Sequence, residues 1–201
     1  MFRLSYKGLG EPLCFLAFGP SATPAFYLAL QPAILKDVAT VTMTAAKVSG
    51  PASLTWPALQ QSAALHSVPA FVWGLSVLVG VSTTIILFTS HFHQIEGDRA
   101  AGKQSPLVRL GVERGVGVLS ACVIGLYVLI AVMVACNVLP PVVLGSALLF
   151  SLGPAKALVD FAEAHRLEPA RLALLKRFAC VWHIALGISL AFGLTVAHVI
   201  G

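Results

Sequence analysis

The sequence predicts an all-α fold, a polytopic bundle of transmembrane helices. Hydrophobic residues make up 58% of the 201 positions and charged residues only 10%, and the mean hydropathy is +0.90. Soluble domains are about 45–50% apolar, and a water-soluble core of this size could not bury so much apolar surface. A bilayer can solvate that surface, because helices satisfy their own backbone polar groups in lipid.

Five apolar segments approach or exceed the length of about 20 residues that crosses a bilayer. They cover residues 11–31, 67–90, 116–136, 138–153 and 178–200. Pro20 and Pro24 interrupt the first. The fourth is short and begins at Pro140 and Pro141, so we expect a tight hairpin with the third. Since no solenoid-type repeat is visible, residues 1–201 form a single transmembrane domain in this interpretation.

The basic residues support five spans and orient them. If the loops alternate, residues 1–10, 91–115 and 154–177 share one side, and every Lys and Arg except Lys36 and Lys47 lies there. Such asymmetry follows the positive-inside rule, and residues 32–66 become a loop on the opposite side. The net charge of +5 therefore reflects topology. Without a basic stripe interleaved with aromatic residues, we expect a lipid bilayer and no nucleic acid as partner.

One segment on the positive side, SHFHQIEGDRAAGKQSPLVRLG (90–111), combines acidic and basic chemistry. Two carboxylates come first, Glu96 and Asp98, and three cations follow, Arg99, Lys103 and Arg109. Carboxylates suit a hard cation such as Mg²⁺, which usually bridges to substrate phosphate, and Lys and Arg bind diphosphate oxygens. The order predicts a metal–diphosphate site. A loop that only contacts lipid headgroups and enforces orientation would have a similar composition.

The geometry of this site depends on how far the second span continues as a helix. In a continuous helix Gln94 and Asp98 share a face, with His91 one turn earlier, whereas Glu96 points elsewhere unless the helix loosens at Gly97. Metal ligation by Gln94, Glu96 and Asp98 together therefore requires some departure from regular helix.

A second polar segment, YKGLGE (6–11), precedes the first span on the same side. Glu11 begins that span, where the helix dipole favours an anion, and a helix start alone would explain it. Alternatively Glu11 faces the 91–111 loop as the second wall of one polar site, with Tyr6 and Lys7 beside it.

Other metal chemistry is less favoured by the pattern. The four Cys lie in apolar runs without a C-x-x-C pair, which predicts packed thiols and neither a disulfide framework nor a cysteine zinc site. His91-x-His93 resembles a transition-metal pair, but the remaining histidines form no further boxes. His183 and His198 lie in the last span, where hydrogen bonds within the bundle would explain them.

At this point the motifs resemble a known family. DRAAGKQSPLVRLG (98–111), directly after a predicted transmembrane helix, resembles the second aspartate-rich motif of the UbiA superfamily of membrane prenyltransferases. YKGLGEPLCFLAFGP (6–20) resembles the start of an earlier helix in its 1,4-dihydroxy-2-naphthoate, or MenA-type, branch. SHFHQIEGD (90–98) is similar to the cyanobacterial and plastid form, which makes phylloquinone. The resemblance covers most of the chain, more loosely after residue 112.

The resemblance implies an all-helical bundle, normally of nine membrane helices, in a plastid membrane or a cyanobacterial or bacterial inner membrane. In this family, acidic motifs hold Mg²⁺ on the diphosphate of a prenyl donor, phytyl or polyprenyl. Ionisation gives an allylic cation that an aromatic acceptor captures, and in this branch 1,4-dihydroxy-2-naphthoate loses its ring carboxylate. Metal and cations would stabilise the leaving diphosphate, and the apolar bundle would exclude water.

Carried over by position, the resemblance makes Asp98 the best-matched catalytic metal–diphosphate ligand and Glu96 the next. Gln94 stands where many members have the carboxylate of Asn-Asn-x-x-Asp, so an amide replaces one metal ligand and Glu96 would substitute for it. Lys103 and Arg109 match basic positions near the diphosphate. The residues of the second wall match only through YKGLGE; they are Tyr6, Lys7 and Glu11.

The larger departure is the first acidic motif of the family, which lies on an early helix ahead of GLGE. No Asp-x-x-x-Asp occurs in this chain. We therefore expect its spans to correspond to the last five of nine, a C-terminal portion that by itself does not bind metal and diphosphate properly. The alternatives are a non-catalytic membrane module whose basic loop binds lipid headgroups or a partner, and a small transporter, which the absence of charge at the span centres disfavours.

Overall fold

The computed structural model describes residues 4–30, 68–168 and 170–200, and the structural statements below concern these residues. The predicted all-α fold is confirmed, since the described chain contains helices and no strand. Five helices are long and apolar enough to cross a membrane: Gly10–Leu30, Ala70–Ser90, Pro106–Ala135, Pro141–Ala164 and Arg171–Ile200. The expected loop 32–66, with Lys36 and Lys47, lies outside the described residues.

The first span is continuous rather than broken at its prolines. It begins as α1 (Gly10–Leu16), widens into a π-helical stretch, Ala17–Ala22, around Pro20, and remains helical to Leu30. Pro20 has no N–H to donate, and a π-type widening absorbs such a gap in the helical ladder. The side chain of Thr23 adds a hydrogen bond from Oγ1 to the carbonyl of Phe18, at 3.1 Å.

Four further helices complete the set of spans. They are α4 (Ala70–Ser90), α6 (Pro106–Ala135), α7 (Pro141–Ala164) and α8 (Leu175–Ile200), the last preceded by a 3-10 turn, Arg171–Leu174. The expected hairpin between the third and fourth spans is present, and Asn137 makes the turn with φ 58°. The fourth span is longer than expected, because α7 continues past Pro154 to Ala164.

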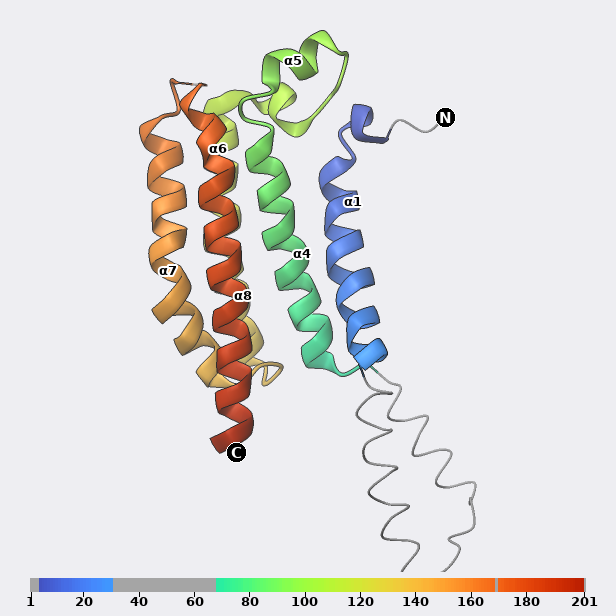
Figure 1. Cartoon of the computed structure of the whole chain (residues 1–201), viewed down its shortest axis with the longest axis vertical. Helices are drawn as coiled ribbons and strands as arrows, with labels where there is room; N and C mark the ends of the chain where they lie inside the picture. The colour runs from blue at the N-terminus through green and yellow to red at the C-terminus, as the bar shows by residue number, and fades with distance from the viewer. Residues whose placement is uncertain (1–3, 31–67, 169, 201) are drawn as a thin grey trace, which may run out of the picture.

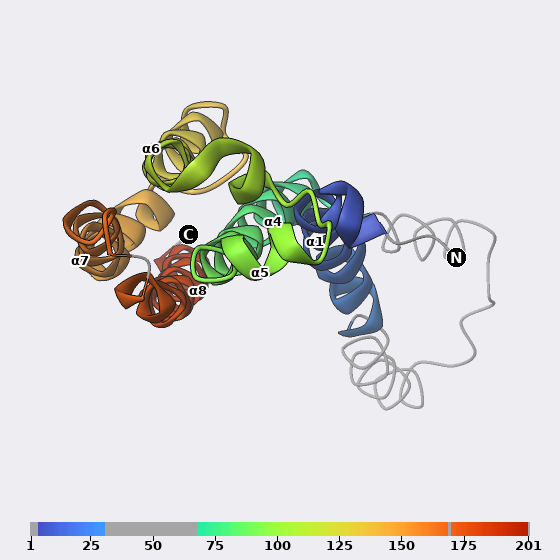
Figure 2. The ribbon, with the colours of Figure 1, turned by 90° about the horizontal axis from the view of Figure 1, so that it is seen from above.

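The helices α4, α6, α7 and α8 surround a common core, and α1 packs on the outer side of α4 (Figures 1 and 2). Large apolar side chains fill this core, among them Leu78, Leu119, Leu126, Leu158 and Trp182. Glycines bring α1 close to α4. A Cβ on Gly19 would lie 2.7 Å from the carbonyl oxygen of Ser76, and one on Gly80 would lie 2.8 Å from the ring of Phe15. Small residues at such contacts let transmembrane helices approach closely.

Polar side chains inside the bundle are paired between helices. The indole of Trp182 on α8 donates to the Tyr127 hydroxyl on α6 at 3.1 Å, and that hydroxyl lies 2.8 Å from the hydroxyl of Ser151 on α7. His183 Nδ1 lies 2.9 Å from Ser82 Oγ on α4. The expectation that His183 is hydrogen-bonded within the bundle is therefore confirmed, and these bonds fix how the four helices sit together.

Candidate functional site

The two polar segments of the sequence meet at one end of the bundle, where α1, α6 and α8 begin and α4 and α7 end (Figure 1). The backbone N–H of Gln104 donates to the carbonyl of Tyr6 at 2.9 Å. The guanidinium of Arg109 donates to the carbonyl of Lys7 at 3.2 Å. Gly8 has φ +74°, and a Cβ there would collide with the carbonyl oxygen of Gln104, so only glycine allows this approach. The YKGLGE segment therefore packs directly against the 91–111 segment.

The second span does not continue as one helix. It ends at Ser90, a turn covers residues 91–94, and a separate short helix, α5, runs from Ile95 to Ala100. A continuous helix would have placed Gln94, Asp98 and His91 on one face, and the structure does not form it. The turn instead directs His91 toward the start of α1, while α5 directs Asp98 back over the bundle.

A small polar pocket lies between the start of α1 and the 91–105 segment. Its volume is about 120 Å³, and its lining consists of Gly10, Glu11, Leu87, His91, Asp98, Lys103 and Ser105. Two polar contacts lie in it. Lys103 Nζ donates to Asp98 Oδ1 at 3.0 Å, and His91 Nδ1 lies 3.0 Å from Glu11 Oε1. Because a carboxylate only accepts, the proton of that bond belongs to Nδ1 of His91.

Two polar atoms in this pocket have no hydrogen-bond partner. They are Oδ2 of Asp98 and Oγ of Ser105, on residues that are only 5% and 3% exposed. An unpaired buried polar atom costs about 1–3 kcal/mol, so a native structure rarely keeps one without a ligand, water or ion. A hard oxygen-seeking cation fits the free carboxylate oxygen of Asp98, since Mg²⁺ is commonly held by one or two carboxylates and substrate phosphates.

The other predicted metal ligands lie outside this pocket. Glu96 and Gln94 are exposed, and Glu96 lines a different pocket of about 450 Å³ with His93, Arg99 and Ala170. The physical reason is helical rotation: residues 96 and 98 are about 200° apart around α5. Within the described ranges, no three His, Cys, Asp or Glu side chains come together as a metal site. The structure therefore brings Asp98 together with Lys103 and Glu11, not with Glu96 and Gln94.

The predicted basic and aromatic residues are also distributed over different places and do not all lie at the polar pocket. Lys103 lies in the polar pocket, and its Nζ is also 5.9 Å from the centre of the Tyr6 ring. Arg109 and the carbonyl of Lys7 join the two walls at the pocket's edge. Arg99 is exposed and belongs to the second pocket, so it does not share the space around Asp98.

Two polar side chains of this pocket, those of His91 and Ser105, were not among the predicted site residues. His91 is 80 positions from its partner Glu11, and only a tertiary structure could pair them. Ser105 is the N-cap residue of α6; the Ser-Pro step before a helix was the available signal for that position, but it does not indicate that the hydroxyl is buried.

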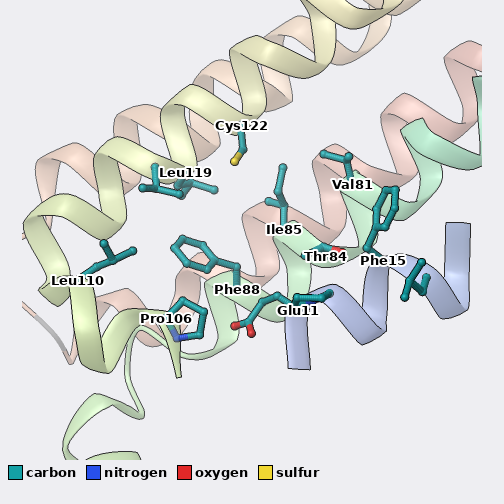
Figure 3. Close-up of a pocket in the computed structure, with 13 residues that line it drawn as sticks. Glu11, Phe15, Val81, Thr84, Ile85, Phe88, Pro106, Leu110, Leu119 and Cys122 are labelled. Atoms are coloured by element: carbon teal, nitrogen blue, oxygen red, sulfur yellow. The ribbon is translucent and has the colours of Figure 1, made fainter. Parts of the chain in front are cut away.

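An apolar pocket of about 580 Å³ adjoins the polar one, between α1, α4 and α6 (Figure 3). Phe15, Ile85, Phe88, Leu119 and Cys122 are among its lining residues, and Glu11 lines both pockets. In Figure 3 the carboxylate of Glu11 points toward Phe88 and Pro106 at one end of this space. The apolar pocket could hold an elongated apolar group within the membrane. The adjoining polar pocket could hold an anionic group attached to the end of that chain.

The known proteins that this chain resembles are prenyltransferases. The description of the UbiA prenyltransferase family matches residues 2–181. The chain is 39% identical over 200 residues, 98% of its length, to the chloroplastic 2-carboxy-1,4-naphthoquinone phytyltransferase of Arabidopsis thaliana. It is 35% identical over 192 residues to the 2-carboxy-1,4-naphthoquinone phytyltransferase of Synechocystis. These matches cover 44% and 51% of the two relatives, so the chain spans about half of their length. No solved structure matches the chain significantly.

Proposed function

The chain belongs to the UbiA prenyltransferase family, and we propose that it takes part in transferring a prenyl group from its diphosphate to an aromatic acceptor in quinone biosynthesis. The observation that carries this proposal is the free, buried Oδ2 of Asp98 beside Lys103, at the polar end of an apolar pocket. A prenyl diphosphate has the same division into an apolar chain and an anionic end.

The finer proposal concerns the substrates and the compartment. The names of the two relatives specify a phytyl donor and a carboxylated naphthoquinone. We propose phytyl or a related polyprenyl as the donor group and 1,4-dihydroxy-2-naphthoate as the acceptor, with loss of the ring carboxylate. Because one relative is chloroplastic and the other cyanobacterial, the proposed location is a plastid membrane or a cyanobacterial or bacterial inner membrane.

In this proposal the polar pocket binds the diphosphate group of the prenyl donor. Asp98, through Oδ2, would hold Mg²⁺, which when bound neutralises charge on the diphosphate as it leaves. Lys103 is 29% exposed at its side chain and can turn from Asp98 toward phosphate oxygens while keeping its charge near the carboxylate. Only one carboxylate with a free buried oxygen is found in the described part of the chain. In this proposal, phosphate oxygens of the donor and a second acidic motif would supply further ligands to the metal.

In this proposal the apolar pocket binds the prenyl chain of the donor. Its walls between α1, α4 and α6 would hold the prenyl chain and keep water from the allylic cation. Glu11, oriented by His91 at 3.0 Å, lines both pockets, and the prenyl carbon from which the diphosphate leaves would lie near it. A fixed carboxylate there stabilises developing positive charge electrostatically.

The test uses a chimera of the Synechocystis relative in which this chain replaces the matched segment of 192 residues. Membranes containing the chimera are supplied with phytyl diphosphate, 1,4-dihydroxy-2-naphthoate and Mg²⁺, and the prenylated product is measured by chromatography. We expect transfer by the chimera and at least about a hundredfold loss with Asp98→Asn, because the free oxygen becomes a neutral amide or carbonyl. Asp160→Asn, an exposed carboxylate on the same membrane side, is the matched control.

A correctly inserted chimera without transfer would contradict the proposal and favour the non-catalytic membrane module. Equal transfer by Asp98→Asn and the parent chimera would remove Asp98 from the site. Transfer by the isolated 201-residue chain would contradict the narrower hypothesis that this chain needs a second acidic motif from outside its own sequence.

A further inference from the structure

A groove on another part of the molecule is separate from the site described above. It lies between α7 and α8 at the same charged end of the bundle, has a volume of about 590 Å³, and is lined by Pro154, Ala157, Leu174, Arg177, Phe178 and Val181. Apart from one guanidinium, every lining side chain is apolar. Since α7 and α8 are membrane-spanning helices, the groove opens toward lipid.

The floor and the width of the groove follow from its residues. Phe178 stacks on Phe161, with ring centroids 4.4 Å apart and planes at 24°, which holds the aromatic floor in place. Ala157 contributes only a methyl group to the facing wall, and Val181 and Leu174 are 58% and 45% exposed along the rim. A flexible hydrocarbon chain can fill such a space without displacing any protein group.

Arg177 is the only charged residue of the groove, and it lacks the carboxylate partner that two nearby basic residues have. Lys156 pairs with Asp160 at 2.5 Å and Arg171 pairs with Glu168 at 2.7 Å. Among the residues that the structure describes, no carboxylate lies within salt-bridge distance of Arg177. An exposed guanidinium at the membrane edge, next to an apolar groove and without a counter-ion from the protein, is complementary to an anionic headgroup.

We propose that this groove binds one anionic phospholipid, with an acyl chain against Phe178 and Val181 and the phosphate on Arg177. Basic pockets between transmembrane helices on the positive side of a membrane are where acidic headgroups bind. An arginine that only extends to the interface would contact any headgroup. A groove that holds the acyl chain below the arginine instead gives a defined stoichiometry and a preference for net negative charge.

The experiment measures lipid retention by the 201-residue chain purified in detergent, with native mass spectrometry after addition of phosphatidylglycerol, phosphatidylcholine or inorganic phosphate. We expect one retained phosphatidylglycerol per chain, weaker retention of phosphatidylcholine, and no effect of phosphate alone. Arg177→Gln should weaken phosphatidylglycerol retention at least about tenfold, the size of one charge-assisted contact. Arg177→Lys should weaken it less.

Two further variants separate a site from general charge attraction. Ala157→Phe fills the groove without changing charge and should also reduce retention, whereas Lys156→Gln removes a neighbouring charge outside the groove and should not. Equal retention by Arg177→Gln and the parent chain would overturn the proposal, as would an equal loss with Lys156→Gln or equal retention of the two phospholipids. Dimers that disappear on addition of lipid would instead assign the groove to a second copy and overturn it too.

Discussion

Replacing Gly19 by alanine should separate α1 from α4 and disturb the polar pocket from a distance. A Cβ at this position would lie 2.7 Å from the carbonyl oxygen of Ser76 and 3.0 Å from Cα of Gly80. Both neighbours are backbone atoms that cannot turn away. Restoring an ordinary contact of 3.4 Å requires the helices to move apart by about 0.7 Å.

That shift is large enough to break the contact between Glu11 and His91. These residues join the same two segments, and a separation of 3.0 Å would grow to about 3.7 Å, beyond hydrogen-bond distance. Overpacking costs about 1–3 kcal/mol, and loss of a hydrogen bond to a charged group costs about 1.5–3 kcal/mol. Gly19→Ala should therefore destabilise the chain by about 2.5–6 kcal/mol.

The assay is unfolding of the chain in detergent micelles, followed by circular dichroism. Gly125→Ala on α6 is the matched control, because a Cβ there meets nothing within 4 Å, and alanine should stabilise that helix by up to about 1 kcal/mol. If the pocket is disturbed as reasoned, Glu11→Gln should cost much less in the Gly19→Ala background than alone. Equal stability of the two alanine variants, or additive effects with Glu11→Gln, would show that the close contact at Gly19 does not hold Glu11 against His91.

Two further substitutions test the buried polar contacts. Tyr127→Phe leaves the indole N–H of Trp182 without its acceptor and should lower the unfolding free energy by about 1–3 kcal/mol, whereas Tyr27→Phe should change it little; similar values for both would show that the network does not stabilise the bundle. His91→Asn keeps a donor near the position of Nδ1 and should preserve both stability and transfer in the chimera. His91→Leu leaves the buried carboxylate of Glu11 unpaired and should impair both, and an unaffected leucine variant would show that Glu11 does not depend on this contact.

The five spans could be predicted from sequence because length and hydropathy are sufficient to identify membrane helices. The residues at which the spans begin and end could not be predicted in this way. The third span was expected from residue 116 and begins at Pro106, and the fourth was expected to end at 153 and ends at Ala164. In both cases a helix continues into a charged segment at the membrane edge, where an apolar window no longer registers it. Gly111 has non-helical backbone angles, φ 74° and ψ 171°, so α6 is kinked there, between its charged beginning and its apolar part.

The candidate site could be predicted in part for a similar reason. Asp98 and Lys103 are close in sequence and could be identified from residue type and order. The position of Glu96 outside the polar pocket could not be predicted, because its direction depends on the helix break at residues 91–94 and on the turn of α5. The pairing of His91 with Glu11 depends on how α1 packs against α4, which local sequence does not specify.

In the proposed function, Asp98 binds the metal-bound diphosphate through its free buried oxygen. The most direct measurement is the affinity of the chimera for a non-hydrolysable phytyl thiodiphosphate, with and without Mg²⁺, by isothermal titration in detergent. Mg²⁺ should strengthen binding at least about tenfold, and Asp98→Asn should remove that gain while Asp160→Asn retains it. If Mg²⁺ strengthened binding by the same factor in Asp98→Asn, the proposed binding of the metal by Asp98 would be contradicted.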